Sequence, residues 1–320
     1  MLLTLAFCRQ GGLALFLNLH SNSIIFMKYP APFSIYLYLL YTLTSILLWS
    51  TASPLFSQTS NEIADSLYIT EVQDRLEPDK VLHAEPLFVD LIRDLGARKG
   101  EREWNVGMGL TDNYQYDRYL ALVEYEWAPI HRLGLEVELP FTLYYGNGQN
   151  SNNDRPSSQL NGLKFAAQYT FFVSQLWKTS LAVGYLNELS LPTFRERSLR
   201  PTGNLYNPFF VGAKRWGNNW HTLIYAGPLF HQHFHSRRWD AEVQWNTNVH
   251  YMITGTRNFI GIEINKEISS QHLHTVLRPQ MRLSIADNLL IGIVTGIPIS
   301  RQNERLSTFL RLIYEPPHHH

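Results

Sequence analysis

Residues 239–251, WDAEVQWNTNVHY, alternate between two kinds of side chain along their whole length. Trp239, Val243 and Trp245 belong to an apolar and aromatic set, whereas Asp240 and Glu242 belong to the polar set between them. A period of two places these sets on opposite faces of an extended strand. One such strand also fits the core of a soluble β-sandwich, so the number of repeats and the connections between them decide the fold class.

The same alternation returns from Trp104 to the end of the chain. It predicts about twelve strands, with lengths close to the roughly 9–11 residues that a tilted transmembrane strand needs. No amphipathic helix separates them, which excludes a βαβ architecture. The predicted strands cover residues 104–110, 118–128, 132–145, 163–172, 180–191, 208–216, 220–230, 239–251, 258–266, 276–285, 289–299 and 306–314.

The connections between the predicted strands alternate in length. After the second strand, short turns such as residues 217–219 (GNN) alternate with long polar loops such as residues 146–159 (GNGQNSNNDRPSSQ). Outer-membrane barrels show this pattern, with short turns at the periplasmic rim and long loops outside the cell. The sequence therefore predicts an all-β, antiparallel transmembrane barrel over residues 104–315, located in the outer membrane of a Gram-negative bacterium.

The alternation also assigns the two faces of each strand. The apolar side is expected to contact outer-membrane lipid and the polar side the lumen, because only a closed barrel satisfies every backbone group in hydrocarbon. In residues 132–145 this puts Val137 outside and Glu136 inside. The residues expected on the lipid side of 220–230 are His221, Leu223, Tyr225 and Leu229.

Aromatic side chains are frequent, with 17 Tyr, 17 Phe and 8 Trp. Those near strand ends are expected to form two girdles at the level of the lipid headgroups. The residues concerned are Trp104, Trp127, Tyr145, Trp216, Trp220, Trp239, Tyr251 and Tyr314.

Residues 1–58 are expected to be an upstream extension and a signal peptide rather than part of the fold. Met27 and Lys28 precede an apolar run, SIYLYLLYTLTSILLW, and small residues before Ser57 supply a cleavage region. Met27 is then the expected start of translation. The alternative is a membrane anchor, because the run approaches the ~20 residues of a spanning helix. Cys8 is the only cysteine, so the barrel has no disulfide or thiolate site.

Charged residues at strand positions that are expected to face the lumen form the main candidate site. Carboxylates on the second and third strands should be cross-strand neighbours, and like charges there need cations between them. The three interpretations are a structural ion-pair lattice, a polar translocation path and a carboxylate pair that carries out hydrolysis. The cluster comprises Glu124, Glu126, Glu136, Glu138, Lys164, Arg278, Arg282 and Arg311.

Histidines form a second candidate site at the long-loop rim. The runs HQHFH and QHLH place imidazoles that could share a zinc or copper ion. The alternative is a set of solvated side chains, because the two runs follow strands of opposite expected parity. No other cofactor is expected. The five histidines are His231, His233, His235, His272 and His274, whereas His318 to His320 belong to a C-terminal tail, residues 316–320.

Residues 59–103 are expected to be a periplasmic segment with a short helix. Pro86 suits a helix start and Gly96 a helix end. A helix this short needs a docking surface, either the barrel lumen as a plug or a periplasmic partner. Its apolar face consists of Leu87, Phe88, Leu91, Ile92 and Leu95.

Residues 83–107, HAEPLFVDLIRDLGARKGEREWNVG, resemble a family of uncharacterised bacterial outer-membrane β-barrel proteins. The resemblance implies a barrel and an outer-membrane location. It transfers no catalytic residue.

These features favour a channel or transporter for a small polar solute. The alternatives are a closed structural, ligand-binding or metal-binding barrel, and a membrane-embedded lipid hydrolase. The hydrolase would need a Ser and a His side by side on the lipid face, where His221 is the well-placed histidine without an evident partner. The chain carries 27 basic and 27 acidic residues, so no nucleic-acid footprint is visible.

Overall fold

The computed structural model describes residues 3–8, 12–17, 69, 78–89, 91–146, 155–196, 198, 200–270, 272–300 and 304–316. The chain divides into two units, Met1–Ser60 and Asn61–His320. In the first unit, β1 (Leu3–Cys8) and β2 (Gly12–Leu17) form an antiparallel hairpin. The second unit contains all the elements described below.

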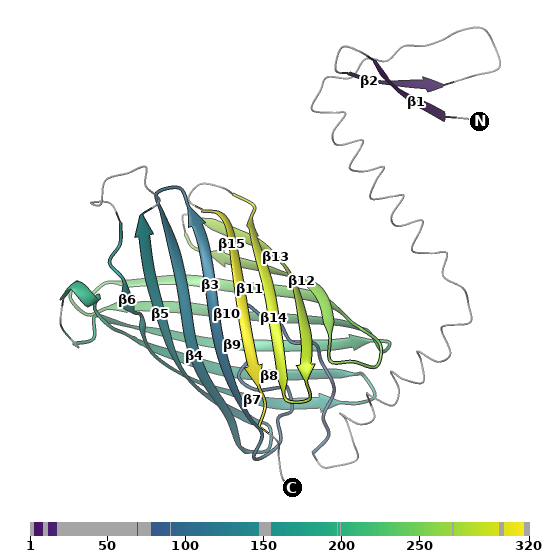
Figure 1. The fold of residues 1–320 in the computed structure, drawn as a ribbon. Helices are drawn as coiled ribbons and strands as arrows, with labels where there is room; N and C mark the ends of the chain where they lie inside the picture. Colours follow the sequence, from purple (N-terminus) through teal and green to yellow (C-terminus); the bar gives the residue numbers. More distant parts are fainter. Residues whose placement is uncertain are drawn as a thin grey trace. The chain divides into compact units, whose positions relative to one another are not determined.

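Twelve long strands form one closed antiparallel ring (Figure 1). The strand order runs from β4 through β3 and β15 down to β5, and the pairing of β4 with β5 closes the ring. The two-residue β6 (Gln159–Leu160) pairs with β5 beside the ring. The long strands are β3 (Arg102–Asn113), β4 (Tyr116–Ile130), β5 (Leu133–Gly146), β7 (Gly162–Ser174), β8 (Thr179–Ser190), β9 (Gly203–Trp216), β10 (Trp220–His233), β11 (Trp239–Met252), β12 (Phe259–Ile268), β13 (Leu273–Ala286), β14 (Leu289–Pro298) and β15 (Glu304–Tyr314).

The prediction of an antiparallel barrel of about twelve strands is confirmed. Each predicted strand overlaps one long strand, and most strands extend a few residues beyond the expected ends. Because β15 pairs with β3, with Arg311 opposite Gly107, the wall has no unpaired edge. Such closure is what a strand-built wall needs inside hydrocarbon.

The two rims differ in their connections. Residues 131–132, 175–178, 217–219, 253–258 and 287–288 are the turns of what we call the short-turn rim, and the opposite end is the long-loop rim. The start of β3 and the end of β15 both lie at the short-turn rim.

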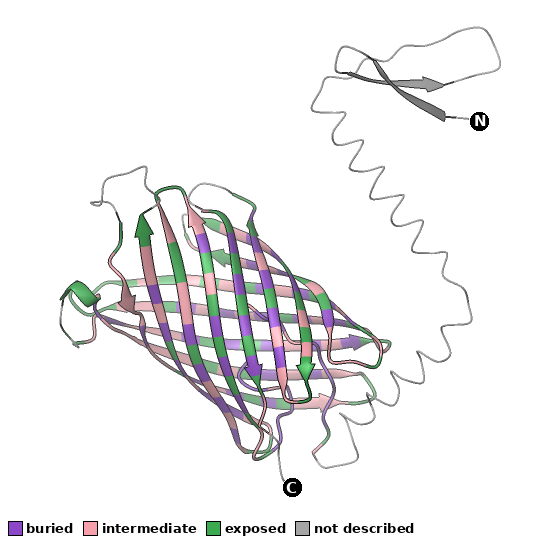
Figure 2. Cartoon of the chain, in the orientation of Figure 1, coloured by how far each residue is buried: buried purple, intermediate pink, exposed green. Residues whose placement is uncertain are grey.

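Burial alternates along the strands, as Figure 2 shows. On β11, Trp239, Val243 and Trp245 are exposed on the outer face, whereas Asn246 and Asn248 are buried inside. Aromatic pairs mark both ends of the outer face: Trp220 stands 5.2 Å from Tyr251 near the short-turn rim. Near the long-loop rim, the rings of Tyr206 and Trp239 stack with their centroids 5.7 Å apart. The ring centroids of Tyr119 and Tyr145 lie 5.3 Å apart at the same rim. An apolar outer face with aromatic ends is typical of a barrel that spans a membrane.

The expected parity of residues 220–230 is wrong. Leu223, Tyr225 and Leu229 are buried inside the barrel, whereas Thr222 and Ile224 belong to the outer face. The error came from the assumption that the inner wall is polar throughout. This part of the wall is apolar because it packs against a segment of the chain that enters the lumen.

The helix expected after Pro86 is also wrong. Within the described residues 78–89 and 91–101, the chain forms bends and turns but no α-helix. The lumen wall supplies hydrogen-bond partners for this backbone, so helical hydrogen bonds are not required. Those partners are described in the next subsection.

Among the described residues, no helix combines the length and the apolar character that a membrane span requires. The predicted signal peptide or anchor, most of residues 59–77, and the tail at 317–320 lie outside the described residues.

The parity of β11 can be tested with two neighbouring arginine substitutions. Val243→Arg should cost about 2–4 kcal/mol of folding free energy in a bilayer, because its side chain is exposed on the lipid-facing side near mid-strand. Gln244→Arg should fold nearly normally, since Gln244 lines an internal cavity. Urea-dependent folding into lipid vesicles, followed by the gel mobility of the folded barrel, measures both. Equal folding of the two variants would contradict the assigned parity.

Candidate functional site

Residues 78–89 and 91–101 lie inside the barrel, and we call them the inserted segment. Their backbone N–H groups donate to inward side chains from several strands. Ala84 donates to His221 Nδ1 (3.0 Å), Leu87 to Gln280 Oε1 (2.8 Å) and Gly96 to Thr170 Oγ1 (3.0 Å). The Gln168 amide in turn donates to the carbonyl oxygens of Ile92 and Arg93, at 3.3 and 3.1 Å. The wall thus replaces the hydrogen bonds of regular secondary structure.

Two glycines of the wall allow the inserted segment to approach closely. A Cβ atom at Gly134 would collide with the carbonyl oxygen of Ile92, and one at Gly292 would lie 2.7 Å from Leu87 Cδ2. Any larger residue at Gly134 must therefore displace the segment or distort β5.

Apolar side chains of the inserted segment pack on two patches of the inner wall. Leu82, Ala84 and Leu87 join a cluster with β4, β11, β12, β14 and β15, and Leu91, Ile92 and Leu95 join one with β7 to β10. The five residues expected on a helix face therefore lie in the lumen, but Leu87 and Phe88 contact one patch and the other three contact the second. At about 1.5–3 kcal/mol for each large side chain fully buried, this packing holds the segment firmly.

Arg93 connects the inserted segment to the acidic wall. It is only 4% exposed and forms an ion pair with Glu103, and its guanidinium lies 3.9 Å from Glu126. Its backbone N–H also donates to Glu126 Oε2 at 2.6 Å. The residue has φ of 62°, a conformation that is unfavourable for a side chain other than glycine. The ion pairs and the Gln168 hydrogen bond hold it there.

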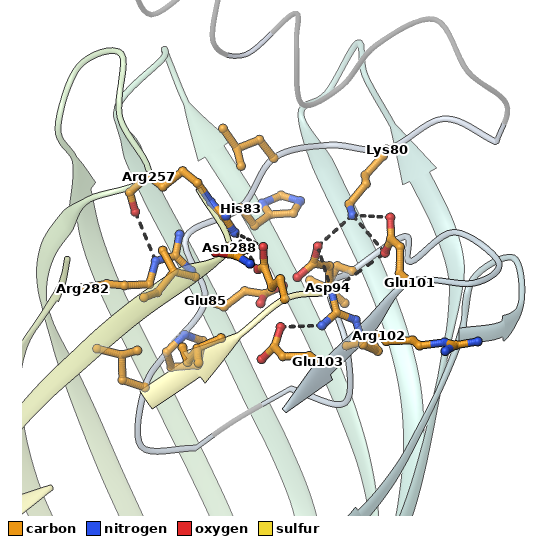
Figure 3. A pocket seen from close by; sticks show the side chains of 18 of the residues that line it. Lys80, His83, Glu85, Asp94, Glu101, Arg102, Glu103, Arg257, Arg282 and Asn288 are labelled. Atoms are coloured by element: carbon orange, nitrogen blue, oxygen red, sulfur yellow. Dashed lines mark hydrogen bonds and ion pairs between the residues drawn. The ribbon is translucent and has the colours of Figure 1, made fainter. Parts of the chain in front are cut away.

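A second set of ion pairs joins the two ends of the inserted segment (Figure 3). Lys80 Nζ lies 2.7 Å from Asp94 and 3.1 Å from Glu101. Burial alone would lower the pKa of Lys80, but the two carboxylates outweigh it and raise that pKa above its ordinary value. Burial would raise the pKa of Asp94, yet Lys80 and Arg93 hold it well below the usual range. Burial, with Asp94 nearby, raises the pKa of Glu85 well above its ordinary value.

The eight charged residues of the candidate cluster all lie on the inner side of the wall, but they form separate groups. One group gathers on β4, β5, β7 and β15. Lys164 pairs with Glu136 at 3.1 Å and also with Glu138, and Arg311 lies 3.4 Å from Glu124. Asn105 donates to Glu124 and Glu126, at 2.8 and 3.2 Å. This group is an ion-pair lattice along one side of the lumen.

Arg278 and Arg282 lie apart from that lattice. The Arg278 guanidinium stacks over the Phe88 ring of the inserted segment, 3.3 Å from its centroid, and donates to Asn265 Oδ1 at 2.6 Å. Arg282 donates to the Arg257 carbonyl oxygen near the short-turn rim, at 3.2 Å. They are therefore tied to the inserted segment and to the rim rather than to the carboxylates of β4 and β5.

Within the described residues, one set of three carboxylates has ligand atoms within 4.8 Å of one another: Glu124, Glu126 and Glu136. Arg311, Arg93 and Lys164 each lie within 4 Å of one of these carboxylates, so the set fits an ion-pair lattice better than a metal centre.

The rim histidines do not form a comparable set in the described part of the chain. His233 contacts Asp240 at 3.0 Å, and His274 lies 3.8 Å from Glu267. His231 and His233 follow Leu229 on the inward parity, contrary to the expectation that they follow a lipid-facing set. Their binding of zinc or copper stays a prediction.

Three internal cavities flank the inserted segment. The largest, about 700 Å³, lies at the short-turn rim and is lined by Lys80, Glu85, Glu103, Arg257 and Asn288 among others (Figure 3). Two more, of about 290 and 270 Å³, are both lined by Phe88; the smaller lies towards the long-loop rim, and the larger is lined by residues from the middle of several strands. The inserted segment therefore lies between the large cavity at the short-turn rim and the two smaller cavities.

A buried contact between His83, near the start of the inserted segment, and the wall was not predicted from the sequence. His83 Nε2 lies 2.9 Å from Ser180 Oγ on β8, and both residues are buried. His221, expected on the lipid face, is also buried inside and accepts the Ala84 hydrogen bond. It therefore does not lie on the lipid face, where the hydrolase hypothesis required it. The 97-residue separation of His83 and Ser180 leaves no local pattern by which sequence could have found the contact.

The profile of a family described as HAEPLYID-like matches residues 79–315. Residues 83–90 of this chain are HAEPLFVD, which agrees with the letters of that description at six of eight positions. The resemblance expected from the sequence is thus confirmed at the level of the family. A comparison with curated proteins found no match.

Solved structures similar to this one are barrels of the outer membrane. An outer membrane channel from Pseudomonas putida F1 is 12% identical, with a TM-score of 0.55 over 69% of this chain and 98% of the channel. The KdgM porin is 13% identical, with a TM-score of 0.45 over 67% and 99% of the two chains. The NanC porin is 11% identical, with a TM-score of 0.46 over 67% and 100%. At these identities the likeness concerns the fold alone.

Arg93→Gln should loosen the inserted segment. The change keeps the cost of the positive φ but leaves Glu103 and Glu126 without their counterion, and breaking such a buried pair costs about 3–5 kcal/mol. We expect faster cleavage of the segment by chymotrypsin, whose cleavage sites the substitution leaves unchanged. Arg305→Gln is the control, because its exposed pair with Asp112 should contribute at most about 1 kcal/mol. Equal cleavage rates for Arg93→Gln and Arg305→Gln would show that Arg93 does not anchor the segment.

Acid should weaken the docking of the inserted segment through His83. Burial, then His221 and Arg215, lower the pKa of His83 from 6.5 to about 3. When the segment is undocked, His83 is protonated below about pH 6.5. When the segment is docked, His83 stays neutral down to about pH 3. Docking is then fully stable above pH 6.5 and weakens as the pH falls, by up to about 1.4 kcal/mol per pH unit.

The measurement is the rate of chymotrypsin cleavage of the segment between pH 7 and pH 4.5, corrected for the activity of the protease on a peptide. His83→Gln should flatten this dependence, and His272→Gln, in an exposed loop, should leave it unchanged. An unaltered slope in His83→Gln would assign the dependence to other groups.

Proposed function

The chain belongs to the HAEPLYID-like family, and we propose that it is an outer-membrane channel for small polar solutes whose lumen is narrowed by its own inserted segment. The observation that carries the proposal is the position of that segment between a cavity at the short-turn rim and two cavities farther along the lumen. Twelve strands enclose a space much narrower than that of the ~16–18 strands of an open porin, so a single segment can restrict it.

The lumen lining supports a polar rather than an apolar solute. Its walls carry the lattice of Glu124, Glu136 and Lys164 on one side and buried asparagines, Asn246 and Asn248, on another. A solute that leaves water can exchange hydrogen bonds with such walls. The outer face offers only lipid contacts, so any path for a solute runs inside.

A closed binding barrel is the second candidate, and the anchoring of the inserted segment favours it. The segment is held by ion pairs at Lys80 and Arg93 and by packing on two patches of the wall. A lumen closed in this way would bind a ligand without passing it. The periplasmic partner expected for residues 59–103 also stays a prediction.

Deletion of residues 59–98 tests whether the inserted segment restricts the lumen, and the conductance of the unaltered chain separates the two candidates, because a closed barrel should show none. A channel restricted by the inserted segment should show higher single-channel conductance in a planar bilayer after the deletion, with normal barrel assembly. The same conductance with and without these residues would mean that they do not restrict the path.

A point substitution can displace the segment without shortening the chain. Gly134→Val places a side chain where the Ile92 carbonyl oxygen now lies, and valine suits a strand, so the expected effect is displacement of the segment and increased conductance. Gly212→Val is the matched control, because a Cβ there meets neighbours at an ordinary 3.4 Å. Unchanged conductance in a normally folded Gly134→Val variant would mean that the segment does not restrict the path.

A further inference from the structure

One of the cavities beyond the inserted segment has the character of a ligand site. We call it the mid-lumen chamber; it has a volume of about 290 Å³ and is bounded by Phe88 and Ile92 of the inserted segment and by inward side chains of β4, β5, β7 to β11 and β15. Sites for small molecules in proteins have volumes of roughly 300–1,000 Å³, so the chamber suits a small ligand.

One wall of the chamber carries more negative than positive groups. Its charged lining residues are Glu124, Glu136, Glu138, Glu188, Lys164 and Arg311, which are four carboxylates and two cations.

The two cations of this wall are already engaged. Lys164 pairs with Glu136 and Glu138, and Arg311 with Glu124. Glu188 lies opposite Lys164 in the register of β7 and β8, yet within the described part of the chain it has no ion pair or hydrogen bond from its side chain.

Glu124 supplies a second, independent sign of an absent partner. The residue is 1% exposed, and its Oε2 atom has no hydrogen-bond partner within the described part of the chain. A buried carboxylate oxygen in this state is costly unless a donor or a cation reaches it. The surplus of carboxylates in the lining, with Glu188 outside any ion pair of the described residues, therefore favours a positively charged ligand.

The part of the lining on β8, β9 and β10 that adjoins Glu188 is apolar and aromatic. Phe209 and Tyr225 stack with their centroids 4.8 Å apart, and Leu186 and Leu229 lie beside them in the lining. In the described structure, arginines stand over the rings of Phe88 and Phe309, but no protein cation stands over Phe209 or Tyr225. Aromatic faces attract cations, and the aliphatic side chains can bury an apolar body.

We infer that the mid-lumen chamber binds a small organic cation with an apolar body, of the class of primary alkyl- and arylammonium ions. Glu188 would receive the ammonium group, because it follows Leu186 on β8 and β8 pairs with β9, the strand of Phe209. The residues Phe209, Tyr225 and Leu229 would receive the apolar part. The inference rests on the proposed function in one respect, because it names the solute class of that channel. The binding site itself does not depend on conduction.

The test is calorimetric titration of the full-length chain in detergent micelles with benzylammonium, benzyl alcohol and benzoate. These probes share an aromatic ring and differ in charge. Benzylammonium should bind at least roughly tenfold more tightly than the other two, because a charged hydrogen-bonded partner contributes more than a neutral one. Glu188→Gln should weaken its binding by roughly tenfold.

Glu242→Gln is the matched control. Glu242 shares the inward parity on β11 but does not line the chamber, so its substitution changes the charge of the lumen and leaves the chamber intact. Equal weakening by both variants would assign the effect to the overall field of the barrel and overturn the inference. Equal affinity for the three probes would also overturn it. Phe209→Leu gives a further check if Glu188→Gln does not fold, and unchanged binding there would remove the aromatic wall from the site.

The outcomes separate this inference from the proposed function. Binding of benzylammonium without conductance in a bilayer would support the chamber and contradict the channel. Conductance without selective binding would support the channel and contradict the chamber.

Discussion

A stretch of irregular chain can lie inside a barrel only if the wall satisfies its backbone hydrogen bonds. Here inward side chains do so: His221, Gln280 and Thr170 accept from the inserted segment, and Gln168 donates to it. These contacts come from strands on different sides of the ring. The inward sequence of the barrel is therefore adapted to one particular segment, and the shape of the lumen depends on that segment.

Electrostatics then fixes the segment in place. Arg93 and Lys80 enter an environment rich in carboxylates, where removing a partner leaves a buried charge at a cost of several kcal/mol. The strained backbone of Arg93 is maintained by these same contacts. Ion pairs between a segment and a wall also leave little freedom for small displacements, so opening of the lumen would have to break several contacts together.

The strands and the segment differ in how far local sequence determines them. Alternation of period two and the lengths of the loops are local signals, and both identified the twelve-strand barrel. The spacing of Leu87, Leu91 and Leu95 is helical in the sequence, but Leu87 packs on one wall patch and Leu91 and Leu95 on the other. The spacing thus reflects a chain that crosses between two walls.

The candidate site shows the same limit. The inward charges of β4 and β5 could be found from parity, because neighbouring strands bring them together. The apolar inner patch at Leu223 and Tyr225 could not, since its polarity is set by the segment that covers it rather than by water or lipid. The Ser180 contact of His83 likewise exists only after the chain has folded over a long distance.

The packing of Leu82 and Leu87 also concerns the seam at which the barrel closes. Pairing of β15 with β3 joins the two ends of the barrel sequence, and such long-range closure is slow because its entropic cost precedes its contacts. Leu82 and Leu87 pack together with Leu122 of β4 on one side of this seam and with Phe309 and Ile313 of β15 on the other. The segment that narrows the lumen therefore also packs across the seam and adds contacts between its two sides in the folded barrel.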